Sequence, residues 1–265
     1  MVAVDGQPGG AFLALPTAIK IYPAYLLIHG AALRRWRSLA AFAGASAALL
    51  ILSIVVLGLD IHRMYFFEVF STIGGGTSWV ENQTINGFLN RLVTPGFVIF
   101  QPDTPGFIRI CAYLAGGLVS LITFMRVQKM QPDAGFGLWI VALLLVLPAA
   151  WIHYQAILLI PLYQLLVRIE RSPGALSWRV LLLYCLAWAL LASGNQWTFF
   201  DKTLHGPIWA LFLSYKFYGL LLLWLALLFD ATARTTTVAQ FAHVSEPSSL
   251  EPAFAMPIHH DYSKS

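Results

Sequence analysis

The chain has 265 residues, of which 58% are hydrophobic and 11% charged, and its formal net charge is +4. Soluble domains carry roughly 25% charged residues, and disordered chains lack the apolar residues that dominate here, so this composition argues against both classes. The mild basic excess needs no nucleic-acid partner, because loop charges that orient a membrane protein account for it. Cys111 and Cys185 both lie in apolar runs, which argues against a disulfide framework or a thiolate metal site. We therefore expect an all-α, polytopic membrane protein.

Seven apolar runs predict membrane-spanning helices, since a span needs about 20 apolar residues. They cover residues 11–33, 39–59, 107–125, 135–151, 152–167, 179–194 and 207–229. The fourth and fifth runs could form one helix, but at about 1.5 Å per residue it would be about 50 Å long. The hydrocarbon core is only about 30 Å thick, so we expect a hairpin of two short spans there.

With this hairpin, most loop arginines and lysines fall on one side of the membrane, the pattern of cytoplasmic loops. They are Arg34, Arg35, Arg37, Arg126, Lys129, Arg168, Arg171, Arg179 and Arg234. The pattern predicts a transmembrane domain over residues 1–230 with its N-terminus outside, and a disordered cytoplasmic tail over residues 231–265. An exterior N-terminus suggests that further spans should precede Met1.

A long exterior loop is predicted over residues 60–106, and loops of this length are usually functional or disordered. Its aromatic-rich beginning, residues 61–70, suits the membrane interface. Residues 77–93 follow as an amphipathic helix, for which Ser78 and Glu81 provide a capping box.

Carboxamide side chains form a stripe on this predicted helix. Asn82, Asn86 and Asn90 are spaced four residues apart, with Gln83 beside them. Each carboxamide offers a donor and an acceptor that match sugar hydroxyls, and the planar guanidinium of Arg91 suits a phosphate. The alternative is a solvated polar face with Arg91 extending to the membrane surface, and the residues alone leave both interpretations open.

Two further polar residues lie at or near membrane depth. Lys20 lies between Pro16 and Pro23, which would break a helix, and either binds an anionic lipid head group or extends to the cytoplasmic surface. His153 follows Trp151 in the predicted exterior turn, where it either handles a proton or a phosphate oxygen, or is structural. No set of residues has the spacing of a metal site, so neither a metal nor another cofactor is expected.

Four segments, AIKIYP, LRRWR, ENQTINGFLNRL and WIHYQAILLIPL, resemble in this order the C-terminal part of glycosyltransferase family 87. The resemblance covers residues 11–229. The family's Trp-x-His-His stretch is matched by Trp151-Ile-His153-Tyr154, with tyrosine in place of the second histidine. The family pattern Asn-Gln-[Ser/Thr]-x-x-Gly-x-x-x-Arg is met by Asn82, Gln83, Thr84, Gly87 and Arg91.

The resemblance implies the GT-C architecture and transfer of a sugar, typically mannose, from a polyprenyl-phosphate donor to a glycolipid or glycan acceptor. The reaction would take place on the exterior face of the cell membrane, so the implied partners are the lipid-linked donor, the acceptor and membrane lipids. We expect His153 to act in catalysis, and we expect six residues to bind substrate: Asn82, Gln83, Asn86, Arg91, Lys20 and Trp151. The family's catalytic carboxylate belongs to a first exterior loop, which would precede Met1, so the chain alone is expected to be inactive.

Two other classes of function stay open. A transporter or lipid flippase would show inverted repeats and broken helices, but the sequence indicates only one broken helix and no matching segment in the second half. The other class is a non-catalytic membrane scaffold, which would tolerate substitution of Asn82, Arg91 and His153.

Overall fold

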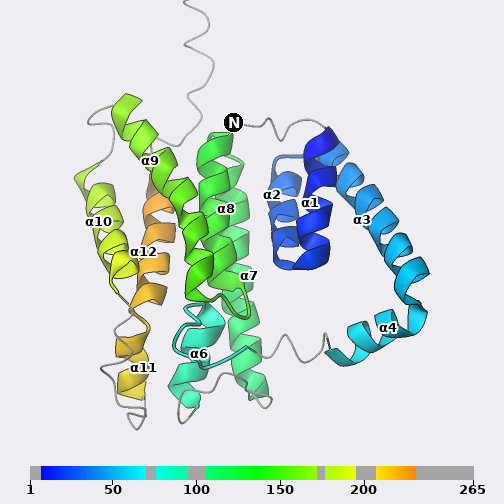
Figure 1. The fold of residues 1–265 in the computed structure, drawn as a ribbon. Coiled ribbons are helices and arrows are strands. Elements are labelled where there is room, and N and C mark those ends of the chain that lie inside the picture. Colours follow the sequence, from blue (N-terminus) through cyan, green and yellow to red (C-terminus); the bar gives the residue numbers. More distant parts are fainter. Residues whose placement is uncertain (1–6, 70–75, 95–104, 172–176, 195–206, 231–265) are drawn as a thin grey trace, which may run out of the picture. The chain divides into compact units, whose positions relative to one another are not determined.

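The computed structural model describes residues 7–69, 76–94, 105–171, 177–194 and 207–230, all within one compact unit. The predicted tail, residues 231–265, and parts of the predicted exterior loop lie outside these residues. Every regular element in the described part of the chain is a helix, as expected (Figure 1). The elements are α1 (Gln7–Ile19), η1 (Tyr22–Tyr25), α2 (Leu26–Ala32), α3 (Trp36–Leu57), α4 (Leu59–Met64), η2 (Tyr65–Val69), α6 (Ile85–Val93), α7 (Gly106–Val127), α8 (Pro132–Val146), η3 (Ile152–Leu158), α9 (Leu159–Arg171), α10 (Trp178–Ala192), α11 (Pro207–Leu213) and α12 (Tyr215–Phe229).

Two helices, α3 and α7, are long and apolar enough to cross a membrane, with 22 residues each. Helices α11 and α12 pass the same test as a pair that is bent by 57°. Three shorter apolar helices lie at Gly9–Ile19, Pro132–Val146 and Trp178–Ala192. In the described residues the structure thus supports two or three of the seven predicted spans by length and composition.

The first predicted span, residues 11–33, is not one continuous helix. The helix ends after Ile19 and the chain reverses into α2, and both α1 and α2 contact α3 (Figure 1). Gly10 in α1 packs directly on Ser38, and Gly30 in α2 packs on Leu39, so both outer ends of the hairpin meet the start of α3. The first predicted span is therefore a helical hairpin in the structure, and the predicted orientation of the N-terminus stays a prediction.

The fourth and fifth runs form two separate helices, as predicted, whereas their crossing of a membrane stays a prediction. Helices α8 and α9 are separate and contact each other through Gly137 of α8, which packs on Pro161 and Gln164 of α9. Residues 138–145 of α8 are all buried, so this helix forms the centre of the core.

Polar contacts show which helices end together. The guanidinium of Arg168 near the end of α9 forms an ion pair with Asp230, the C-cap of α12, with an N–O distance of 2.5 Å. Arg126 in the last turn of α7 donates to the backbone oxygen of Asp230 at 3.2 Å. Helices α7, α9 and α12 therefore end at one end of the bundle, the arginine end, and α6 and η3 lie at the opposite end (Figure 1).

The helix predicted over residues 77–93 is shorter than expected. It begins at Ile85, and its N-cap is Thr84, whose hydroxyl accepts a hydrogen bond from the Gly87 amide at 3.0 Å. The predicted capping box of Ser78 and Glu81 is therefore wrong. Side chains of the Asn and Thr type compete with the helical backbone for hydrogen bonds, which favours the irregular course of residues 76–84.

Candidate functional site

Three segments that are distant in the sequence meet at the α6 end of the bundle. They are the tip of the α1–α2 hairpin, the turn over residues 147–154 that leads into η3, and residues 76–94. The ammonium group of Lys20, at the hairpin tip, donates to the Tyr154 hydroxyl and lies 4.2 Å from the centre of the tyrosine ring. The Tyr22 ring packs edge-on against Tyr154 with 6.2 Å between ring centres. The hairpin tip thus fixes one side of the turn.

Asn82 fixes the other side of the same turn. Its side-chain amide donates to the Pro148 carbonyl at 3.1 Å, and its side-chain oxygen accepts from the Ala150 amide at 3.1 Å. The same amide donates to the Thr77 carbonyl, and Asn82 is 1% exposed. Asn82 therefore pairs with the backbone on both sides of residue 149, and the turn that carries His153 is held between Lys20 and Asn82.

Gln83 binds the break between α11 and α12. Its amide donates to the Leu213 carbonyl at 2.9 Å and also to the carbonyl of Val80, and its oxygen accepts from the Phe217 amide at 2.8 Å. A helix end leaves backbone groups without helical partners, and one carboxamide here satisfies a carbonyl and an amide across the break.

Arg91 binds the same break from α6. Its Nε and Nη2 atoms donate to the Ser214 hydroxyl at 3.1 and 2.9 Å, and its Nη1 atom donates to the carbonyls of Trp79 and Asn82. Burial lowers the pKa of Arg91 to about 9, so the guanidinium stays charged at neutral pH. In the described part of the chain, Arg91 has only neutral hydrogen-bond acceptors and no ion pair with a carboxylate.

The rest of the carboxamide stripe is also buried. The Asn90 amide donates to the side-chain oxygen of Asn86 at 2.7 Å, and Asn86 packs on Gly76, whose φ of +77° favours glycine. Gly87 packs so closely on Asn82 that an added Cβ would lie 2.1 Å from the Asn82 carbonyl oxygen. The alternative of a solvated polar face is therefore wrong, because these side chains bind the protein itself.

The accessible groups at this end lie on the turn and the hairpin tip. His153 is exposed, and its ring centre lies 4.4 Å from that of Tyr154. Lys20 is exposed and Trp151 is partly exposed. Of the residues predicted for the site, these three can reach a bound molecule directly, whereas Asn82, Gln83, Asn86 and Arg91 are buried.

Sequence reasoning missed two residues of this region. Ser214 lies inside an apolar run that was predicted to be one uninterrupted span, and a single serine in such a run is a weak signal. Glu81 was assigned to a capping box, but it is partly buried and no hydrogen bond to it is found among the described residues. Its carboxylate is therefore available for another role.

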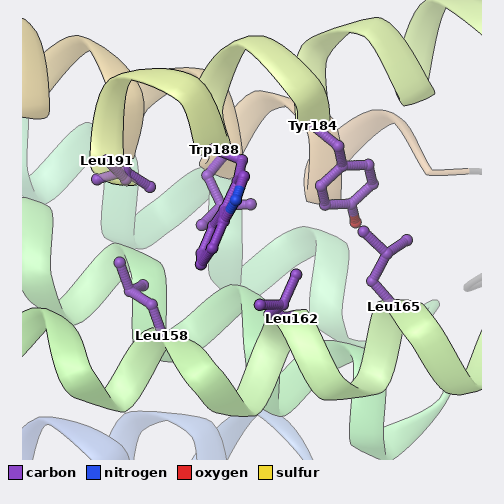
Figure 2. A pocket seen from close by; sticks show the side chains of 7 residues that line it. Leu158, Leu162, Leu165, Tyr184, Trp188 and Leu191 are labelled. Carbon is purple, nitrogen blue, oxygen red and sulfur yellow. The ribbon is translucent and has the colours of Figure 1, made fainter. Parts of the chain in front are cut away.

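An apolar cavity of about 40 Å³ lies between α9, α10 and α12 (Figure 2). It begins at Leu158, the last residue of η3, five positions after His153. The residues that line it are Leu158, Leu162, Leu165, Tyr184, Trp188, Leu191 and Leu223. Among the described residues, no group of three or more His, Cys, Asp or Glu side chains could hold a metal ion.

The family model described as glycosyltransferase family 87 matches residues 2–148, which is more than half of the chain. The chain belongs to glycosyltransferase family 87. Membership of this family makes it a membrane glycosyltransferase, in agreement with the apolar helices. The family 87 match includes Lys20 and the segment from Asn82 to Arg91, and it ends just before Trp151 and His153. Comparisons with curated proteins and with solved structures gave no match.

Proposed function

We propose that this protein transfers a sugar, with mannose as the first candidate, from a polyprenyl-phosphate donor to a glycolipid or glycan acceptor. The enzyme would be of the GT-C type and multi-pass, and it would act at the exterior face of the cell membrane. Family membership supports the transfer reaction, and the apolar helices support substrates that reside in a membrane. One observation carries the location: Lys20 and Asn82 hold the turn that exposes His153, at the end of the bundle opposite to the arginine end.

In the proposed reaction, the acceptor hydroxyl oxygen forms a bond to C1 of the sugar while the bond from C1 to the phosphate oxygen breaks. The polyprenyl phosphate leaves with the electron pair, and the hydroxyl proton passes to a base. His153 is exposed, and an imidazole ring can accept a proton from a hydroxyl group, so we assign it to this proton transfer. Lys20 is the exposed cation beside it, and we assign it to the anionic head group of a lipid substrate.

Asn82, Gln83, Asn86 and Arg91 have a positioning role in this proposal. Their side chains are buried and bind backbone and side-chain groups of the protein. Direct contact of these residues with the sugar stays a prediction. We propose that they fix residues 148–150 and the α11–α12 break, and that this holds His153 and Lys20 in place for the substrates.

The experiment that tests the function is deletion of the gene in its own host, followed by mass spectrometry of the lipid-linked sugars and envelope glycans. We expect polyprenyl-phosphate mannose to accumulate and one mannosylated product to disappear. The wild-type gene should restore that product, and a His153→Ala gene should not. Unchanged donor and product levels in the deletion strain would refute the proposal.

One observation favours a transporter or flippase as the second candidate. The α1–α2 hairpin and the bent α11–α12 pair are two broken helices in different halves of the chain, a feature of many transporters. The break at Ser214, however, is filled by Gln83 and Arg91 instead of facing an open cavity. In the deletion experiment a flippase would leave the transferase activity of isolated membranes intact, whereas loss of a transferase would abolish it.

A further inference from the structure

Lys216 is a buried lysine to which the proposed function has assigned no role. It lies in the first turn of α12, two residues after Ser214, and it is 4% exposed. Its ammonium group donates to the Leu191 carbonyl at 3.0 Å, and no described carboxylate forms an ion pair with it. Removing an ammonium group from water is costly unless it is paired, and one neutral carbonyl compensates only part of that cost. The site is therefore favourable for an anion.

The position of Lys216 relative to the apolar cavity indicates which anion. Leu191 accepts the hydrogen bond from Lys216 with its backbone oxygen, and its side chain lines the cavity. Figure 2 shows Leu191 and Leu158 toward one end of the cavity and Tyr184 with Leu165 toward the other. Lys216 does not itself line the cavity, but its ammonium group lies against the backbone of Leu191, which does. A cation close to one end of an apolar slot between helices fits an amphiphile with a negatively charged head.

A second buried cation strengthens this electrostatic preference. Arg91 donates to the hydroxyl of Ser214, on the same helix break, and it also lacks an ion pair with a described carboxylate. The first turn of α12 adds the positive end of a 15-residue helix. Two positively charged side chains that are shielded from solvent therefore lie at the α11–α12 break.

We propose that Lys216 binds the phosphate of the isoprenoid-phosphate donor, and that the isoprene unit next to this phosphate occupies the cavity between α9, α10 and α12. The identity of the donor rests on the proposed function. A volume of about 40 Å³ has room for about three water-sized groups, so one isoprene unit is the part that enters and the rest of the chain lies in lipid. The donor then lies near Leu158, at the C-terminal end of η3. Lys20 lies near the N-terminal end of η3, where it can bind the acceptor.

A purely structural role for Lys216 makes a different prediction. A lysine near the end of α10 stabilises the last helical carbonyls as a cap. Lys216→Gln separates the two roles, because glutamine keeps an N–H donor for the Leu191 carbonyl and removes the charge. Lys216→Arg keeps the charge, and Lys129→Gln removes an exposed lysine at the arginine end as the matched control.

The experiment is photolabelling of the full chain in phosphatidylcholine nanodiscs with farnesyl phosphate that carries a diazirine on its first isoprene unit. We expect labelled peptides from α9, α10 or α12, with competition by unlabelled farnesyl phosphate and little by farnesol, phosphatidic acid or inorganic phosphate. Lys216→Gln should weaken labelling about tenfold, since a charge-assisted hydrogen bond contributes about 1.5 kcal/mol or more. Lys216→Arg and Lys129→Gln should label as the wild type does.

Three results would overturn the proposal. Wild-type labelling confined to peptides outside these three helices would exclude the cavity, and this readout requires no variant. Equal competition by farnesol would exclude phosphate recognition, and equal competition by phosphatidic acid would make this a general lipid site. Unchanged labelling of Lys216→Gln would leave Lys216 only the structural role of capping α10. Labelling does not depend on sugar transfer, so it can succeed where the gene deletion refutes the proposed function, and the reverse also holds.

Discussion

The side-chain oxygen of Gln83 accepts a hydrogen bond from the backbone amide of Phe217, 134 residues further along the chain. The same carboxamide donates to the Leu213 carbonyl on the other side of the α11–α12 break. One side chain of the predicted exterior loop therefore supplies two hydrogen bonds that a continuous helix would have made internally. The loop segment and the bent helix pair depend on each other.

Gln83→Ala tests this dependence. It leaves a buried carbonyl and a buried amide without partners, at a cost of about 1–3 kcal/mol for each group. We expect a clearly lower midpoint of thermal unfolding in detergent, together with loss of product in membranes of the complemented strain. Gln128→Ala, at an exposed glutamine that ends α7, is the control and should change neither measurement. Equal unfolding midpoints for the two variants would contradict the assigned contacts.

Gly87 provides a test of the close contact between α6 and Asn82. An added Cβ would lie 2.1 Å from the Asn82 backbone oxygen, so Gly87→Ala must displace Asn82 from the 148–150 turn. We expect lower stability and lower transfer activity. Gly117→Ala is the matched control, since Gly117 lies inside α7 with nothing within 4 Å of an added Cβ. Gly117→Ala should leave the free energy of unfolding unchanged or raise it by up to about 1 kcal/mol, because glycine is a poor helix former.

The start of α6 is tested by two substitutions. Thr84→Ala removes the hydroxyl that caps the helix and should lower the free energy of unfolding by about 1 kcal/mol. Glu81→Gln should leave stability unchanged, because Glu81 lies outside the helix and caps nothing. Chemical unfolding of both variants in mild detergent measures the difference. A stability loss for Glu81→Gln as large as that for Thr84→Ala would support the predicted capping box and contradict the cap at Thr84.

Hydropathy and length predicted the parts of the fold that depend on them. They predicted α3 and α7, which are long and apolar. They also predicted separate helices α8 and α9, because a single helix in their place would be too long for the bilayer. Hydropathy and length did not predict the reversal between α1 and α2, since an apolar hairpin has the same hydropathy as one continuous apolar helix. Pro16 and Pro23 indicated a broken helix, but not the direction in which the chain continues.

The site was predicted less completely, for a different physical reason. Periodicity grouped Asn82, Asn86 and Asn90 on one face, but it cannot distinguish water from a buried protein partner. The partners come from backbone at residues 148–150 and 213–217, more than 60 positions away. The break at Ser214 has no proline or glycine to mark it, and side chains from another segment complete its hydrogen bonds.

His153 and Lys20 are expected to affect different kinetic parameters. His153→Ala should lower the maximal transfer rate about 100-fold if His153 handles the proton, since general acid–base catalysis contributes about that factor or more. Lys20→Met should mainly raise the acceptor concentration needed for half-maximal rate, because it removes a cation that binds a head group. The His153 side chain is exposed, so His153→Ala should change the unfolding midpoint no more than the exposed Lys129→Met control does. Lys20→Met also removes the contact with Tyr154, so it should lower the midpoint slightly. The rates are measured in membranes of the complemented strain and normalised to the amount of this protein. A His153→Ala variant with the wild-type maximal rate would remove His153 from the chemistry, and the partly buried Glu81 would become the next candidate for the base.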